Sequence, residues 1–116
     1  MANDEIFESA IRPNGDLAGV YEYDGETGYF YLYKTGSGEN KVLAAIHIFS
    51  GPSDFIADDI EILWDRKNEK VGLFIHQKLW AVFDAMQGAS YGGDYQIGAT
   101  PQLPSQIVSG FKQKKH

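Results

Sequence analysis

The chain consists of short runs of β-branched and aromatic residues, separated by clusters of Gly, Asp, Asn and Ser. This pattern is typical of antiparallel hairpins rather than of helices. The links between the runs are short except at residues 50–58, and short links join antiparallel neighbours. We therefore expect a mainly β domain, an antiparallel meander of about six to seven strands. The runs that predict strands are residues 17–23, 28–35, 41–49, 59–64, 70–75 and 78–84.

The two ends of the chain carry weaker signals. Residues 6–11 predict either an edge strand or a single helical turn, ended by a turn at residues 13–16. The stretch from Gly88 to Tyr95 is rich in Gly, Ser and Tyr and predicts an ordered loop. Residues 104–111 predict at most a short helix, because proline is tolerated near a helix start.

Composition predicts one globular domain. With 116 residues, 43% hydrophobic and 22% charged, the chain suits a single core. We place the domain at residues 1–111 and a flexible basic tail at residues 112–116. The absence of cysteine excludes disulfides and thiol nucleophiles and suits a reducing cytoplasm. The acidic start differs from a secretory signal, and no apolar run approaches the roughly 20 residues that span a bilayer. We expect a soluble cytoplasmic protein.

The charge is concentrated in the folded body. The formal net charge is -6, but three basic residues lie in the last five positions, so residues 1–111 hold seven basic and 16 acidic residues, a net charge of -9. Such a surface repels phosphate backbones and anionic lipid. We therefore expect no nucleic-acid or membrane partner and favour a basic protein partner, although solubility alone explains the charge equally well.

Two later hairpins predict which side chains share a face. If Asp65 lies opposite Lys70, one apolar face carries Ile60, Ile62, Trp64, Val71, Leu73 and Ile75. A two-residue turn at His76-Gln77 adds Trp80 and Val82 to that face. The reverse face then carries Phe74, Leu79, Ala81 and Phe83. Because both faces are apolar, the sheet must be covered twice, so we expect a barrel, a sandwich or half of a homodimer.

The first hairpin is unusually rich in tyrosine. A loop at residues 24–28 predicts Tyr23 opposite Tyr29 and Tyr21 opposite Tyr31. One face would then carry Tyr21, Tyr23, Tyr29, Tyr31 and Tyr33, and the other Val20, Glu22, Phe30 and Leu32. One interpretation is a protein-binding face, because tyrosine recurs at interface hot spots. The alternative is that these rings form cross-strand pairs that stabilise an edge hairpin, and strand aromatics are more often structural.

Catalytic signals are sparse. The chain has no Gly-x-Ser-x-Gly motif, and its histidines are His47, His76 and His116. His116 ends the tail and His76 lies in a predicted turn, which leaves His47 within an apolar run. We predict no catalytic residue. A small-ligand pocket beside the Gly88 to Tyr95 loop would be formed by His47, Asp84, Tyr91 and Asp94.

Cofactor and metal signals are equally weak. Asp54, Asp58, Asp59 and Glu61 cluster near the long link, but their spacing does not match a calcium loop. The glycines at residues 36–38 join two strands, and no helix follows to donate amides to a phosphate. We therefore predict no metal site and no cofactor.

Several segments together resemble a known kind of family. They are Ser50-Gly51-Pro52-Ser53-Asp54-Phe55, the strands at residues 59–65, 70–75 and 79–84, and Gly92-Gly93-Asp94-Tyr95. On these motifs the chain resembles small bacterial domain families of unknown function, over roughly residues 17–105. The resemblance implies a bacterial, soluble, mostly β protein and supplies no catalytic residues.

Two functional hypotheses remain. The first is a non-enzymatic module that binds a protein partner through its acidic, tyrosine-rich face, and immunity proteins that neutralise a basic toxin are of this kind. The second is a small-ligand-binding protein or minor enzyme that uses the pocket beside the Gly88 to Tyr95 loop. Homodimerisation is compatible with both.

Overall fold

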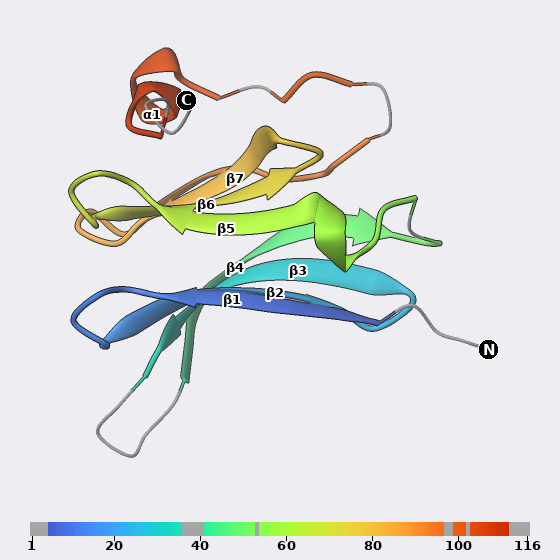
Figure 1. Ribbon diagram of the computed structural model, residues 1–116, viewed down its shortest axis with the longest axis horizontal. Coiled ribbons are helices and arrows are strands. Elements are labelled where there is room, and N and C mark those ends of the chain that lie inside the picture. The colour runs from blue at the N-terminus through green and yellow to red at the C-terminus, as the bar shows by residue number, and fades with distance from the viewer. Residues whose placement is uncertain (1–4, 36–40, 53, 97–98, 102, 112–116) are drawn as a thin grey trace.

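The computed structural model describes residues 5–35, 41–52, 54–96, 99–101 and 103–111. It contains two four-stranded antiparallel sheets that face each other as a sandwich (Figure 1). The first sheet is β1 (Ile6–Ile11), β2 (Leu17–Tyr23), β3 (Thr27–Lys34) and β4 (Lys41–Ser50). The second is β5 (Ile60–Trp64), β6 (Lys70–Ile75), β7 (Lys78–Asp84) and β8 (Ala89–Gly92). A 3-10 turn, η1 (Ala57–Asp59), precedes β5, and a short helix, α1 (Ser105–Ser109), follows the second sheet.

These elements confirm a mainly β fold and select the sandwich from the expected alternatives. The meander is interrupted once, at the long link, because each sheet is a separate meander of four consecutive strands. Residues 6–11 are the edge strand β1, and residues 105–109 are the expected short helix. The predicted loop at residues 88–95 is wrong in part, since Ala89–Gly92 pairs with β7. Residues 112–116, predicted as a tail, lie outside the described residues.

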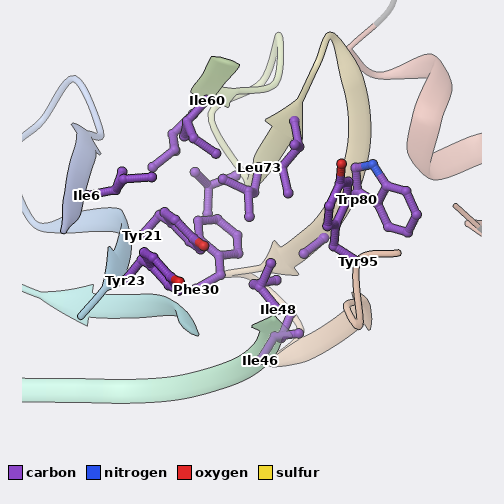
Figure 2. Close-up of a cluster of buried hydrophobic side chains, with 14 of the residues drawn as sticks. Ile6, Tyr21, Tyr23, Phe30, Ile46, Ile48, Ile60, Leu73, Trp80 and Tyr95 are labelled. Atoms are coloured by element: carbon purple, nitrogen blue, oxygen red, sulfur yellow. The ribbon is translucent and has the colours of Figure 1, made fainter. Parts of the chain in front are cut away.

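The core lies between the two sheets (Figure 2). The Phe30 ring of β3 lies 5.1 Å from the Phe83 ring of β7, and both side chains are buried. Gly19 on β2 allows close approach of the sheets, because a Cβ there would lie 2.6 Å from Cγ2 of Val71 on β6. The interior is thus closely packed across the middle of the sandwich.

Hydrogen bonds join the sheets near both edges. At one edge, the Trp64 indole N–H on β5 donates to the Ala10 carbonyl on β1, at 3.0 Å. At the other edge, the segment after β8 returns to β4. The Asp94 and Tyr95 amides donate there to the His47 and Ile48 carbonyls, at 3.0 and 2.7 Å. The returning segment therefore satisfies part of the open edge of β4.

The β5–β6 hairpin has the predicted register, with Ile60, Ile62 and Trp64 paired to Ile75, Leu73 and Val71. The turn at residues 76–77 is also as predicted, since Ile75 pairs directly with Lys78. Both turn residues have positive φ, 51° and 71°. This conformation matches a two-residue hairpin turn whose twist suits the strands.

The predicted faces of β7 are correct for Leu79 and Trp80 and wrong from Ala81 onwards, because the β6–β7 ladder contains a bulge. Leu73 pairs with Ala81, whereas Phe74 pairs with Leu79, so Trp80 is an extra residue on β7. A bulge moves every later side chain to the opposite face. Three side chains therefore lie on the face opposite to the predicted one. Ala81 and Phe83 point to the core, and Val82 points outwards.

The outer face of the second sheet is covered by the chain itself. Ile107 of α1 and Phe111 pack against Leu79 and Val82 of β7, and all four side chains are buried. This C-terminal segment lies on the far side of the second sheet from the first (Figure 1). The second apolar face therefore needs no partner subunit to cover it. No helix within the described part of the chain has the length and apolar character to cross a membrane.

Candidate functional site

The five hairpin tyrosines do not share one face. The prediction paired Tyr23 with Tyr29, but in the structure Tyr23 pairs with Gly28 and Tyr29 with Glu22. The physical cause lies in the turn, where the Asp24 carboxylate accepts hydrogen bonds from the amides of Glu26 and Thr27, at 2.9 and 2.8 Å. The turn is therefore tighter than predicted, and a one-residue shift moves every side chain of β3 to the opposite face.

The tyrosines consequently divide by strand. Tyr21 and Tyr23 of β2 point inwards and are buried, at 0% and 2% exposure (Figure 2). Tyr29, Tyr31 and Tyr33 of β3 lie on the outer face of the first sheet, since Phe30 and Leu32 between them are buried. The Tyr23 hydroxyl donates to the Gly51 carbonyl, so this ring ties β2 to the link after β4.

The outer face of the first sheet is mostly apolar and partly exposed. We call it the tyrosine face. Across the sheet, the paired positions follow one another in three rows: Phe7, Glu22, Tyr29 and His47; then Ser9, Val20, Tyr31 and Ala45; then Ile11, Ala18, Tyr33 and Val42. Among these side chains, Phe7 is 66% exposed and Ile11 61% exposed. Isolated exposed apolar residues are common, but a contiguous apolar face marks a candidate binding surface.

Glu22 is the acidic side chain of the tyrosine face. Its strand neighbours are Phe7 on β1 and Tyr29 on β3. The Tyr29 and Tyr31 rings are stacked, with centroids 6.0 Å apart and an interplanar angle of 15°. Burial raises the pKa of Tyr31, and the nearby charge of Glu22 raises it further. This part of the face therefore combines a carboxylate with two parallel rings, a combination suited to a cationic side chain.

At the corner of this face, His47 contacts two polar side chains. Its Nδ1 lies 2.9 Å from Oδ1 of Asp94, and its Nε2 lies 2.8 Å from Oγ of Ser50. The Tyr29 ring lies edge-on to the imidazole, 5.5 Å between centroids. The predicted pair of His47 and Asp94 is thus brought together, and Ser50 joins it.

The other two predicted ligand residues lie elsewhere. Asp84 is at the opposite end of β7 from the segment that reaches His47, and its carboxylate accepts the amides of Met86 and Gln87. Tyr91 pairs with Val82 and packs in the outer cluster under α1. The four predicted side chains therefore do not converge on one pocket. One surface hollow, of about 500 Å³, is lined instead by residues 58–61, 76 and 77.

That hollow includes some of the acidic residues weighed as metal ligands. Nδ1 of His76 lies 3.6 Å from Oδ1 of Asp59. The Asp54 carboxylate is directed elsewhere and accepts the Tyr95 hydroxyl at 3.2 Å. Within the described part of the chain, no three His, Asp or Glu side chains are grouped as metal ligands.

Sequence reasoning missed Phe7 and Ser50. The alternation of residues 6–11 could have indicated Phe7, because it places that ring on the face opposite buried Ile6. Ser50 carried no such signal. It lies three positions after His47, a spacing that puts side chains of a regular strand on opposite faces. A bulge in β4 overrides that rule, and the sequence does not reveal it.

The chain belongs to a family described as "Uncharacterized protein conserved in bacteria (DUF2251)", whose model matches residues 1–103. This confirms the expected bacterial family of unknown function. An uncharacterized protein of Haemophilus influenzae is 28% identical over 101 residues, which cover 78% of this chain and 63% of that relative. No solved structure matches the chain. Helix α1 lies beyond the part that the family model matches.

Proposed function

We propose that the chain is a protein-binding module that docks a basic partner on the tyrosine face. The observation that carries this proposal is that the outer face of the second sheet is covered by the chain, whereas the outer face of the first sheet exposes large apolar side chains. The C-terminal segment buries the outer face of the second sheet. The first sheet instead exposes Phe7, Ile11 and Val42 to solvent, at 66%, 61% and 49%. Covering such side chains would remove apolar area from water, at about 25 cal/mol per Å².

The aromatic rings of the tyrosine face are also preorganised for binding. The rings project from a sheet whose other side is packed into the core. The backbone that carries them is therefore already ordered in the unbound protein. Tyrosine offers a large contact area with few rotatable bonds, which lowers the entropy lost on binding. Stacking of their rings along β3 already restricts Tyr29 and Tyr31.

Charge indicates the chemistry of the partner. The chain carries a net charge of -6, and Glu22 places one carboxylate between Phe7 and Tyr29. An arginine or lysine of the partner would pair with Glu22 and lie against the ring of Tyr29 or Tyr31. A second copy would bring two acidic bodies together, and a nucleic acid would meet the same repulsion. An immunity-type inhibitor of a basic toxin would belong to this class.

The test is capture of binding proteins at low salt with three forms of the chain. They are the wild type, Glu22→Lys on the tyrosine face, and Glu61→Lys on the exposed side of β5. Glu61→Lys is the matched control, because both glutamates are exposed strand residues and both changes alter the net charge equally. We expect a basic protein to bind the wild type and Glu61→Lys, and to be lost with Glu22→Lys.

A photo-crosslinker in place of Phe7 then locates the contact. We expect it to join covalently to the same basic protein, and not to an acidic or neutral one. Equal capture by all three forms, or crosslinks only between copies of the chain, would refute the proposal. The cytoplasmic location and the homodimer stay predictions; light scattering tests the second.

A further inference from the structure

Ser50, His47 and Asp94 form a linear chain of polar contacts. Oγ of Ser50 lies 2.8 Å from Nε2 of His47, and Nδ1 of the same ring lies 2.9 Å from Oδ1 of Asp94. A carboxylate can only accept, so Nδ1 must carry the proton that it shares with Asp94. In the neutral ring, Nε2 is then a free acceptor, directed at the Ser50 hydroxyl. This is the order of contacts that activates a serine nucleophile.

A bulge in β4 brings the serine and the histidine together. Gly28 of β3 pairs with Phe49, whereas Tyr29 pairs with His47, so Ile48 is an extra residue. Ile48 is fully buried, and the strand continues beyond it with its faces exchanged. His47 and Ser50, three positions apart, therefore point to the same side. Bulges recur beside active sites, where they redirect a side chain in this way.

The aspartate is held by the backbone. Asp94 has a positive φ of 52°, a conformation that few non-glycine residues adopt. Its amide donates to the His47 carbonyl at 3.0 Å, and the next amide, of Tyr95, donates to the Ile48 carbonyl at 2.7 Å. These bonds fix the backbone of Asp94 against the strand that carries His47. Uncommon backbone geometry held in this manner is found at functional sites more often than elsewhere.

We propose that Ser50 is a nucleophile that takes the acyl group of small carboxylic esters, with His47 as its general base and Asp94 as a positioning residue. This inference is independent of the partner-binding proposal. Oγ of Ser50 attacks the ester carbonyl carbon and its proton passes to Nε2 of His47. The bond from that carbon to the alcohol oxygen breaks, and His47 returns the proton to the departing alcohol. Water then cleaves the acyl-serine and releases the carboxylic acid.

The surroundings limit the substrate. The His47 side chain is 39% exposed and that of Asp94 83% exposed, so the site is open and sets little restriction on the alcohol part. The Tyr29 ring stands beside the imidazole and offers an apolar wall to a short acyl chain. The acidic chain repels anionic esters. We therefore expect neutral or cationic esters with small acyl groups.

The test uses a fluorophosphonate probe, which reacts covalently with activated serine hydroxyls, on the full chain. The labelled residue is identified by mass spectrometry of peptides. We expect Ser50 to be labelled in the wild type and in Ser90→Ala, which removes an exposed strand serine without a histidine partner in the described contacts. Ser50→Ala should lose the label. His47→Gln should slow labelling at least about 100-fold, the usual contribution of a general base.

Asp94→Asn tests the positioning role. Asparagine tolerates positive φ, so the backbone should be retained. Its amide group can donate to Nδ1, which leaves the proton on Nε2 and removes the base. We expect slower labelling, by at least about 100-fold, with an unchanged melting temperature. Labelling of Ser50 at equal rates in wild type and His47→Gln, or no label on Ser50 in the folded wild type, would overturn the proposal.

Discussion

Gly28 of β3 leaves the space that the hydroxyl group of Tyr21 on β2 occupies. A Cβ at Gly28 would lie 2.4 Å from that oxygen, far inside van der Waals contact. Tyr21 is fully buried, and its hydroxyl has no hydrogen-bond partner within the described part of the chain. Burial accordingly raises the pKa of Tyr21. The glycine and the tyrosine are therefore coupled through packing, and not through a hydrogen bond.

This coupling predicts a non-additive pair of substitutions. Gly28→Ala should lower the free energy of unfolding by about 2 kcal/mol, because an added methyl group overpacks the site. Tyr21→Phe should raise it by about 1 kcal/mol, since an unpaired buried hydroxyl is removed. In the double variant the nearest contact of the new methyl group lengthens from 2.4 Å, to the hydroxyl oxygen, to 3.0 Å, to ring carbon Cζ, so part of the Gly28→Ala loss should disappear. Urea unfolding of the four proteins measures this; strictly additive changes would contradict the coupling.

Two phenylalanines provide a matched comparison of buried and exposed rings. Phe111→Ala should lower the free energy of unfolding by about 3 kcal/mol, because its ring is buried against Phe74 and β7. Phe7→Ala should change it by less than about 0.5 kcal/mol, because that ring is 66% exposed. Phe111→Ala should also increase binding of a hydrophobic dye, as the cover of the second sheet loosens. Equal losses for both variants would show that the outer faces are assigned incorrectly.

Asp84 is expected to stabilise the fold and to take no part in binding. Its buried carboxylate accepts the amides of Met86 and Gln87 in the β7–β8 turn. Asp84→Ala should therefore lower the free energy of unfolding by about 2 kcal/mol, and Asp84→Asn by less, since one oxygen acceptor remains. Both variants should retain partner capture and Ser50 labelling. A loss of either activity in folded Asp84→Asn would return this residue to the candidate site.

Alkaline pH should destabilise the chain through Tyr95. Burial, aided by the charge of Asp54, raises the pKa of Tyr95 from 10.0 to about 12. The folded state thus favours the neutral phenol. Its contribution to stability is complete below pH 10, the unfolded value, and is lost as the pH rises towards 12. Urea midpoints between these pH values measure the effect, and they should fall less steeply for Tyr95→Phe, which cannot ionise.

The sequence predicted the elements far better than the faces. The bounds of β2, β6 and β7 matched, because alternating apolar runs and turn residues determine them locally. The two face assignments failed for one reason each, and both involved a single residue. In the first hairpin, the Asp24 side chain tightened the turn. In the β6–β7 hairpin, Trp80 is an extra residue, which exchanges the faces of Ala81, Val82 and Phe83.

The candidate sites also depend on single-residue shifts. Tyr29 and Tyr31 are outside only because β3 is shifted against β2, and Ser50 meets His47 only because Ile48 is an extra residue in β4. A strand reverses its side chains with every residue, so an error of one position exchanges core and surface. Periodicity cannot resolve this, because both faces of these strands carry large apolar side chains.

Chemical modification of tyrosine tests the register of the first hairpin directly. Nitration requires solvent access to the ring, so Tyr29, at 36% exposure, should react in the native chain. Tyr21 and Tyr23 should be protected, because both are buried between the sheets. Peptide mapping after brief treatment identifies the modified rings, and the unfolded chain supplies the control in which all react. If β3 were shifted by one residue, Tyr29 would be protected together with Tyr21 and Tyr23. Nitration of Tyr21 or Tyr23 at the rate of Tyr29 would likewise contradict the register, and with it the tyrosine face.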